Sequence, residues 1–310
     1  MVINVKKLVK RYGDLIALDH FNLEVQEGEI LGLLGPNGSG KTTAINCILS
    51  LLKYDKGTIE IFDQPMSPDA YAIKRDIGIV MQNVAVLDEL TVYENIDYFC
   101  GLYIADRQTR KKLVAEAIDF VGLNDFTKFF PKKLSGGLLR RLNIACGIAH
   151  QPKLIILDEP TVAVDPQSRN NILEGIQKLN RQGATIIYTS HYMEEVEQIA
   201  SRIAIMDKGK IIAMGTNEEL KKKIKSGEHI NLELLNPEDL DLEAIKALPH
   251  IISAELSDHQ LEVKSGRDKN NLIAILDQLK DQSIAIGKIY SEPPTLNDVF
   301  LEITGKELRD

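Results

Sequence analysis

Hydrophobic and polar residues alternate along residues 2–10 and 16–25, which predicts antiparallel strands that bury one face and expose the other. Later segments are almost continuously apolar, which predicts strands buried on both faces: residues 29–35, 153–158 and 184–189. Apolar residues recur at helical spacing around these strands: residues 40–52, 91–150, 166–182 and 192–200. Strands that alternate with helices predict an α/β core with a largely parallel sheet.

The pattern changes after residue 220, and the lysine-rich stretch 221–227 is interpreted as a linker. Beyond it the pattern predicts strand, helix, strand, strand, helix, strand and a final helix: residues 229–235, 238–247, 251–257, 260–264, 268–281, 284–290 and 295–303. This order is typical of a small split β-α-β module. Two domains are therefore expected, at 1–220 and at 228–310.

Charge and cysteine content narrow the class of protein. The net charge is −8 and the pI about 5.4, and neither residues 1–220 nor residues 221–310 have a positive net charge. A dedicated nucleic-acid binder is therefore disfavoured. The three cysteines are odd in number and far apart in the sequence, as expected for buried thiols in a reducing compartment.

Membrane and secretion signals are missing from the pattern. No apolar run approaches the roughly 18–20 residues that span a bilayer, and the N-terminus lacks a signal-peptide pattern. We expect that the chain itself does not cross a membrane, which leaves open that a partner docks it on one.

A phosphate-binding loop is predicted where the first buried strand meets a helix. Its glycines let backbone N–H groups face phosphate, and the helix adds its positive N-terminal end. The Lys41 ammonium reaches terminal phosphates and the Thr42 hydroxyl ligates Mg²⁺. An ordinary glycine-rich turn is the alternative, and the strand–loop–helix context disfavours it. The candidate nucleotide-binding residues are Gly35, Pro36, Asn37, Gly38, Ser39, Gly40, Lys41, Thr42 and Thr43.

Two acids end the second buried strand, where a carboxylate is unexpected without a function. Asp158 suits a Mg²⁺ contact through water, and Glu159 suits the carboxylate that orients or deprotonates an attacking water. A solvated strand end is the alternative, and the neighbouring phosphate loop disfavours it.

A second anion-binding helix start is predicted at Leu134-Ser135-Gly136-Gly137, before a long helix. The Ser135 hydroxyl and the N–H groups of Gly136 and Gly137 form such an end.

In order and spacing, these three segments resemble those of the ATP-binding cassette (ABC) ATPases, over roughly residues 1–220. The resemblance implies a P-loop α/β cassette with an antiparallel β subdomain and a helical subdomain at about 83–150, followed by a small α+β C-terminal domain. It implies ATP and Mg²⁺ as ligands. It also implies two cassettes head to tail, with Ser135, Gly136 and Gly137 of one covering the ATP of the other and Asp165 crossing between them.

Further site residues follow from the same resemblance. His191 is expected to contact the γ-phosphate and the attacking water, Gln82 to contact Mg²⁺ and that water, and Tyr12 to stack on adenine. For Tyr12 the alternative is a strand residue packed on the core, and for His191 a purely structural loop residue.

Two departures from the family pattern occur. Leu138 stands where a glutamine or another polar residue is usual, and Val162-Ala163-Val164 stands where Ser-Gly-Leu is commoner. Neither removes a catalytic group, so they bear on the interface between cassettes and on the turnover rate.

The segment 292–305 resembles the C-terminal signature of the daunorubicin-resistance type of ABC-2 exporters. The resemblance implies an ATP-hydrolysing subunit at the cytoplasmic face of the membrane, bound to a polytopic permease through its helical subdomain. The second cassette is either another copy or a related chain. As a structural alternative, Leu296, Val299, Phe300 and Ile303 form a helix face packed on its own domain.

Two other functions are weighed. Soluble ABC ATPases act on ribosomes or DNA, but they tend to carry two cassettes or a long coiled-coil insertion, which this sequence lacks. A weakly hydrolysing regulatory cassette is favoured only by Leu138 and opposed by Glu159 and His191. The transported substrate is left open.

Overall fold

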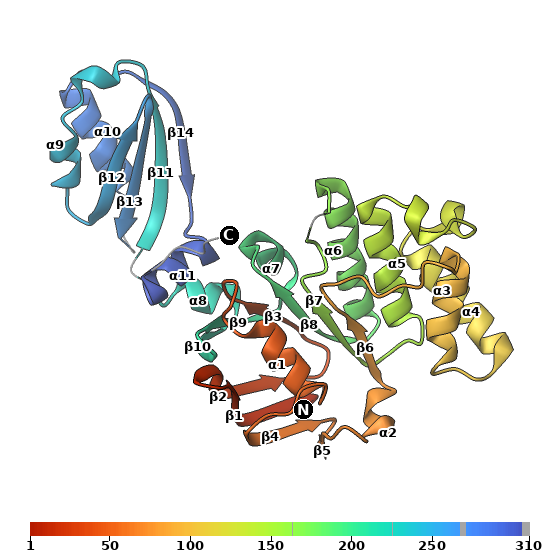
Figure 1. The fold of residues 1–310 in the computed structure, drawn as a ribbon. Coiled ribbons are helices and arrows are strands. Elements are labelled where there is room, and N and C mark those ends of the chain that lie inside the picture. The colour runs from red at the N-terminus through yellow and green to blue at the C-terminus, as the bar shows by residue number, and fades with distance from the viewer. Residues whose placement is uncertain (163, 225, 267–270, 306–310) are drawn as a thin grey trace. The chain divides into compact units, whose positions relative to one another are not determined.

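The computed structural model describes residues 1–162, 164–224, 226–266 and 271–305. The chain divides between Asn217 and Glu218 into two compact units (Figure 1). Ala163, one residue of the expected linker and the first residues of the expected helix 268–281 lie outside the described residues.

The first unit is built on a six-stranded sheet in the order β10-β9-β3-β8-β7-β6. All neighbours pair in parallel except β9 and β10, which are antiparallel. The predicted α/β core is thereby confirmed. The strands are β3 (Ile30–Leu34), β6 (Ile77–Val80), β7 (Leu154–Asp158), β8 (Thr185–Ser190), β9 (Arg202–Asp207) and β10 (Lys210–Gly215).

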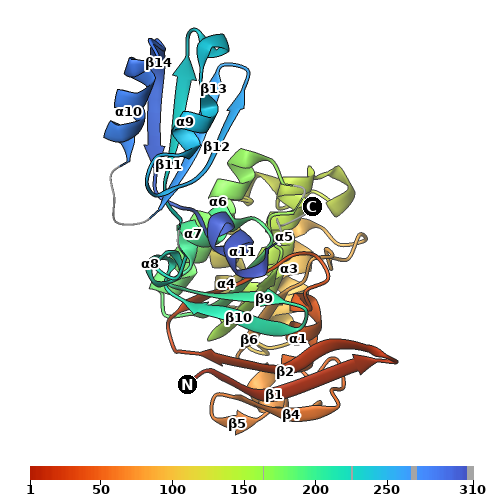
Figure 2. The ribbon, with the colours of Figure 1, turned by 90° about the vertical axis from the view of Figure 1, so that its left-hand side faces the viewer.

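A separate antiparallel sheet, in the order β2-β1-β4-β5, covers one side of this core. Its strands are β1 (Ile3–Tyr12), β2 (Leu15–Val25), β4 (Lys56–Ile61) and β5 (Gln64–Pro65). Helix α1 (Lys41–Ile48) contributes to a hydrophobic cluster shared by both sheets, in which Leu8, Ile45 and Ile156 are fully buried. Figure 2 shows β1, β2 and β4 as a layer distinct from β9 and β10.

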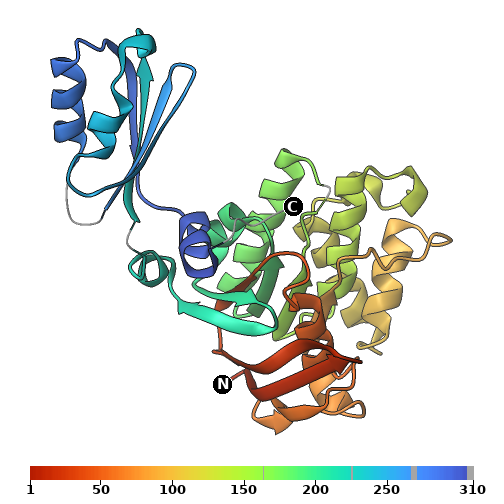
Figure 3. The ribbon, with the colours of Figure 1, turned by 60° about the vertical axis from the view of Figure 1, so that its left-hand side comes forward.

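Helices fill the remainder of the first unit. The segment expected to be mostly helical contains α3 (Val92–Gly101), α4 (Arg107–Phe120) and α5 (Gly136–Ile148), which lie together at one end of the unit in Figure 3. The others are α2 (Tyr71–Lys74), α6 (Pro166–Arg181) and α7 (Met193–Ile199). Helix α8 (Asn217–Lys221) begins at the residue where the two units divide. Since β3, β7 and β8 run parallel, their carboxyl ends meet at one sheet edge, where ligands of such folds bind.

The second unit has a four-stranded antiparallel sheet in the order β12-β13-β11-β14. Its elements are β11 (Ser226–Leu234), α9 (Leu242–Lys246), β12 (Ile251–Ser257), β13 (Gln260–Gly266), α10 (Leu272–Asp281), β14 (Ile286–Glu292) and α11 (Leu296–Thr304). The predicted β-α-β-β-α-β order is confirmed. The helix expected at 238–247 is shorter, because Pro237–Asp239 forms a 3₁₀ turn and Asp241 then caps α9.

Helix α11 is tied to the sheet of this unit. Thr295 and Asp298 form a reciprocal cap at its start, and the Asp298 carboxylate lies 3.2 Å from His229 Nε2 on β11. On the predicted helix face, Leu296, Val299 and Phe300 are buried, whereas Ile303 is 38% exposed.

No helix among the described residues is long and apolar enough to cross a membrane.

Burial should make the cysteines chemically inert in the folded chain. Cys47, Cys100 and Cys146 are free and buried, and desolvation raises the pKa of Cys47 and of Cys100 to about 11. Since the thiolate is the nucleophile, we expect iodoacetamide to leave the native chain almost unmodified at pH 7.5, with reactivity rising as the pH approaches 11.

Mass spectrometry would measure this, and the chain unfolded in denaturant, where all three thiols should react, is the control. Rapid native alkylation of one thiol would show that its burial is incomplete.

Candidate functional site

The loop between β3 and α1 adopts a conformation that only glycine readily allows at several positions. Gly40 precedes α1 with φ 105° and Gly38 has φ 78°, both in the left-handed region. A Cβ on Gly35 would lie 2.3 Å from the Met206 carbonyl oxygen. The loop is therefore closely packed against β9 at one end and turns sharply at the other.

Lys41 is the first residue of α1, and its side chain is 5% exposed. Its ammonium donates to the carbonyl oxygens of Gly35 at 2.7 Å and Pro36 at 3.2 Å. Burial lowers the pKa of Lys41, and the charges of Glu159 and Asp158 oppose that shift. Beside it, the buried Ser39 hydroxyl has no hydrogen-bond partner among the described residues. A buried cation and an unpaired hydroxyl in one loop suit a phosphate group.

Asp158 ends β7 and is fully buried. Its two carboxylate oxygens accept hydrogen bonds from different elements: Oδ2 from the Thr42 hydroxyl at 3.0 Å and Oδ1 from the Thr189 hydroxyl at 2.6 Å. These bonds hold the carboxylate directly beside the phosphate loop.

Glu159 is the point at which separate segments converge. Gln82 Nε2 donates to Oε2 at 3.1 Å, while Lys41 Nζ and His191 Nδ1 lie 3.6 and 3.4 Å from Oε1. The backbone of Glu159 has φ 48°, a sparsely populated region for a residue with a side chain. The structure thus brings together six predicted site residues, namely Lys41, Thr42, Gln82, Asp158, Glu159 and His191.

The second predicted helix start makes a different set of contacts. Ser135 caps α5 and accepts a hydrogen bond from the Leu138 N–H at 3.3 Å, so the departure at position 138 leaves the cap intact. Asp165 caps α6, and hydrogen bonds from Ser168 hold its pKa below the usual range. A Cβ on Gly137 would lie 2.7 Å from Ser168 Oγ. Ser135 and Gly136 are exposed.

Tyr12 ends β1 with its side chain 48% exposed, and the Lys10 ammonium lies 4.9 Å from its ring centroid. Its ring is therefore available at the surface rather than packed in the core.

Sequence reasoning missed a buried network around Glu195 on α7. One carboxylate oxygen accepts from the hydroxyls of Thr161 at 2.8 Å, Tyr188 at 2.6 Å and Ser190 at 2.9 Å. Arg169 Nε lies 3.3 Å from the other oxygen. Thr161 lies two residues after Glu159 and Ser190 precedes His191, so this carboxylate links, through their hydroxyls, the segments that carry Glu159 and His191. The sequence did contain a signal for this network, because Tyr188 and Ser190 are polar residues in the buried strand β8 and need hydrogen-bond partners there.

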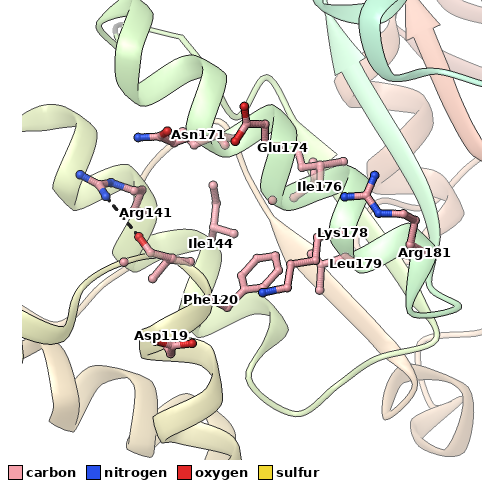
Figure 4. A pocket seen from close by; sticks show the side chains of 15 residues that line it. Asp119, Phe120, Arg141, Ile144, Asn171, Glu174, Ile176, Lys178, Leu179 and Arg181 are labelled. Atoms are coloured by element: carbon pink, nitrogen blue, oxygen red, sulfur yellow. Dashed lines mark hydrogen bonds between the residues drawn. The ribbon is translucent and has the colours of Figure 1, made fainter.

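A cavity of about 390 Å³ lies between α4, α5 and α6, and none of its lining residues belongs to the phosphate loop (Figure 4). Phe120, Arg141 and Lys178 are among them, and the Lys178 ammonium lies 5.3 Å from the Phe120 ring centroid. The cavity is therefore separate from the group of side chains that converge on Glu159.

Comparisons with known proteins agree with this geometry. Residues 18–162 match the family described as ABC transporter, and residues 215–304 match the C-terminal domain of DrrA1-3-like ATP-binding proteins. The linearmycin resistance ATP-binding protein LnrL of Bacillus subtilis is 36% identical over 313 residues, covering 100% of both chains.

The chain is an ABC transporter ATP-binding protein of the daunorubicin-resistance type.

The family resemblance seen in the sequence is thereby confirmed, and the cassette is an ATPase. A Nod factor export ATP-binding protein of Ralstonia nicotianae is 32% identical, covering 100% of this chain and 95% of its own. A solved dimeric cassette in a post-hydrolysis state with ADP and Pi is 28% identical, with a TM-score of 0.63, and covers 69% of this chain and 98% of its own.

The Glu195 network generates a stability prediction. Glu195→Ala leaves three buried hydroxyls without their acceptor and Arg169 without its counter-charge, and should lower the free energy of unfolding by about 3 kcal/mol. Urea unfolding followed by circular dichroism measures this.

Glu194→Ala is the matched control, because Glu194 is the exposed neighbour on the same helix and should change the free energy by less than about 0.5 kcal/mol. Equal effects of the two substitutions would contradict the assigned role of the network.

Proposed function

We propose that this chain energises an ABC-2-type exporter, and that two cassettes close on ATP, hydrolyse it and reopen. The observation that carries the proposal is the convergence of Lys41, Gln82 and His191 on the Glu159 carboxylate. A base, a cation and two polar side chains beside a phosphate loop are the groups that phosphoryl transfer to water requires.

Each group has a distinct role in this mechanism. The loop 35–40 and the first turn of α1 hold the phosphates with their backbone N–H groups, and Lys41 exchanges its carbonyl contacts for terminal phosphate oxygens. Glu159 orients the attacking water and takes its proton. His191 contacts the γ-phosphate and that water, and the half-exposed Tyr12 ring stacks on adenine.

Mg²⁺ suits the oxygen groups beside the loop. Thr42 and Asp158 already lie 3.0 Å apart, and Gln82 supplies an amide oxygen. Bound there, Mg²⁺ neutralises phosphate charge. No group of three or more acidic, histidine or cysteine side chains among the described residues forms a metal site by itself. Mg²⁺ commonly completes its coordination with substrate phosphates and water.

The position of the second helix start supports the pairing of two cassettes. Ser135 and Gly136 are exposed at the start of α5, so their N–H and hydroxyl groups are free to bind a phosphate from outside the chain. Asp165 caps the neighbouring helix at the same surface. A closed two-fold dimer satisfies two such surfaces at once.

A permease is proposed as the membrane partner, which places the cassette at the cytoplasmic face. Large apolar side chains are exposed on the helical subdomain: Val84, Leu87, Tyr93, Tyr98, Leu102, Phe129 and Phe130. Similar proteins are named for resistance and for export, which supports outward transport.

Glu159→Gln should lower steady-state phosphate release by about 10²–10⁴-fold, because an amide cannot accept the proton of the attacking water. ATP binding should persist, and the variant should accumulate as an ATP-held dimer, measured by phosphate release and size-exclusion chromatography.

Glu27→Gln, at an exposed turn, is the control and should hydrolyse normally. Lys41→Ala should instead weaken ATP binding itself, because it removes the buried cation. Normal turnover in Glu159→Gln would refute the assignment of Glu159.

Co-purification tests the exporter. The tagged chain, expressed in its own host and recovered from gently solubilised membranes, should bring down a stoichiometric polytopic membrane protein. Recovery only from the cytosol, from ribosomes or from DNA would refute the proposal that the chain energises an exporter, and only its assignment as an ATPase would remain.

A further inference from the structure

Arg140 is a buried cation that the mechanism above does not use. It lies on α5 and is 3% exposed. Within the described part of the chain, its guanidinium donates only to backbone carbonyl oxygens, which form two groups from distant parts of the sequence. Nη1 bonds Met81 O at 3.0 Å and Gln82 O at 2.7 Å.

The second group of carbonyls lies at the end of β7 and in the turn that follows it. Nε bonds Pro160 O at 2.7 Å, and Nη2 bonds Glu159 O at 2.5 Å and Asp158 O at 3.4 Å. A guanidinium carries five N–H donors in a planar fork. Each of them therefore has an acceptor here, and together they connect the segments that carry Gln82 and Glu159.

We propose that Arg140 is a positioning residue that fixes Gln82 and Glu159 relative to each other and to α5. The inference rests on the proposed function, since it concerns how the two groups are held for hydrolysis. Arg140 contacts the carbonyls rather than the side chains of these residues, so it acts through their backbone.

The backbone of Glu159 needs such a restraint. With φ 48° it persists only where the surroundings hold it. Its N–H is held by the Thr189 hydroxyl at 2.9 Å, and its carbonyl by Arg140. Both ends of this residue are therefore fixed by side chains from other elements.

The position of Arg140 on α5 gives the restraint a further consequence. Ser135 and Gly136 begin that helix, and Arg140 lies little more than one turn later. A small displacement of α5, when its start binds a phosphate, would be passed to the carbonyls of Gln82 and Glu159. Arg140 thus couples the second anion-binding end to the hydrolytic groups.

Lysine cannot replace this arrangement. Its ammonium has three donors on one atom, and it cannot span two groups of carbonyls. Arg140→Lys keeps the positive charge and the aliphatic part of the side chain, so it tests the planar arrangement of guanidinium donors alone. Arg140→Gln additionally removes the charge. Arg141→Lys is the matched control, because Arg141 is the adjacent arginine, donates to the Val121 carbonyl, and lines the cavity in Figure 4.

The experiment compares kcat, KM for ATP, the Kd of a fluorescent ATP analogue and Tm for the wild type and these variants of the full chain. We expect Arg140→Lys to lower kcat by about 100-fold, as small misplacements of catalytic groups do. The analogue Kd should stay within about twofold, since Lys41 and the loop are unchanged. Arg141→Lys should resemble the wild type. If Arg140→Gln does not fold, Arg140→Lys decides alone.

A double-mutant cycle separates positioning from general stabilisation. If Arg140 acts through Gln82, the losses in kcat from Arg140→Lys and Gln82→Ala should be strongly non-additive. Additive losses, a parallel loss of ATP affinity, or equal effects of Arg141→Lys would each overturn the inference. Absence of hydrolysis by the wild type would instead overturn the proposed function.

Discussion

An ammonium and two carboxylates lie buried at one edge of a parallel sheet, and the first unit is organised around keeping them there. Each would cost several kcal/mol if left without partners. Lys41 and Glu159 lie 3.6 Å apart, and Asp158 takes hydroxyl bonds from Thr42 and Thr189. Because these partners come from different strands and helices, the site forms only when the whole sheet is assembled.

Next to these charges in the fold are two further buried side chains, one a hydrogen-bond donor and one an acceptor. Arg140 donates to the carbonyls at the end of β7 and in the turn after it, whereas Glu195 accepts from the hydroxyls of Thr161, Tyr188 and Ser190. A buried network of this kind stabilises only when every member is satisfied. Arg140 also restrains the strained backbone of Glu159, so the stability of the fold and the geometry around Glu159 depend on the same contacts.

The second unit has its own hydrophobic core, in which Leu232, Val263 and Ile275 are fully buried. Within the terminal signature, the Asp298 carboxylate caps α11. It lies 3.2 Å from His229 Nε2 and 3.8 Å from Lys264 Nζ, which are both on the sheet of this unit. The terminal signature thus includes a structural element of its own domain.

Local patterns in the sequence determined much of this protein. The phosphate loop and the two acids at the end of β7 are each contained within a few consecutive residues, so they could be recognised directly. Each strand and helix likewise has a periodicity that can be read from its own residues. The helix expected at 238–247 was too long because the turn at Pro237–Asp239 competes with helical spacing. Arg140 was overlooked because charged residues on helices are usually solvated.

What only the tertiary structure decided is which distant residues meet. Asp158 and Thr189 are partners in the register between β7 and β8, and Gln82 reaches Glu159 across 77 positions of sequence. The burial of Arg140 depends on how α5 docks beside those strands. Since such contacts arise from register and docking rather than from neighbouring residues, the sequence identified the chemistry, and the fold selected the groups that hold it in place.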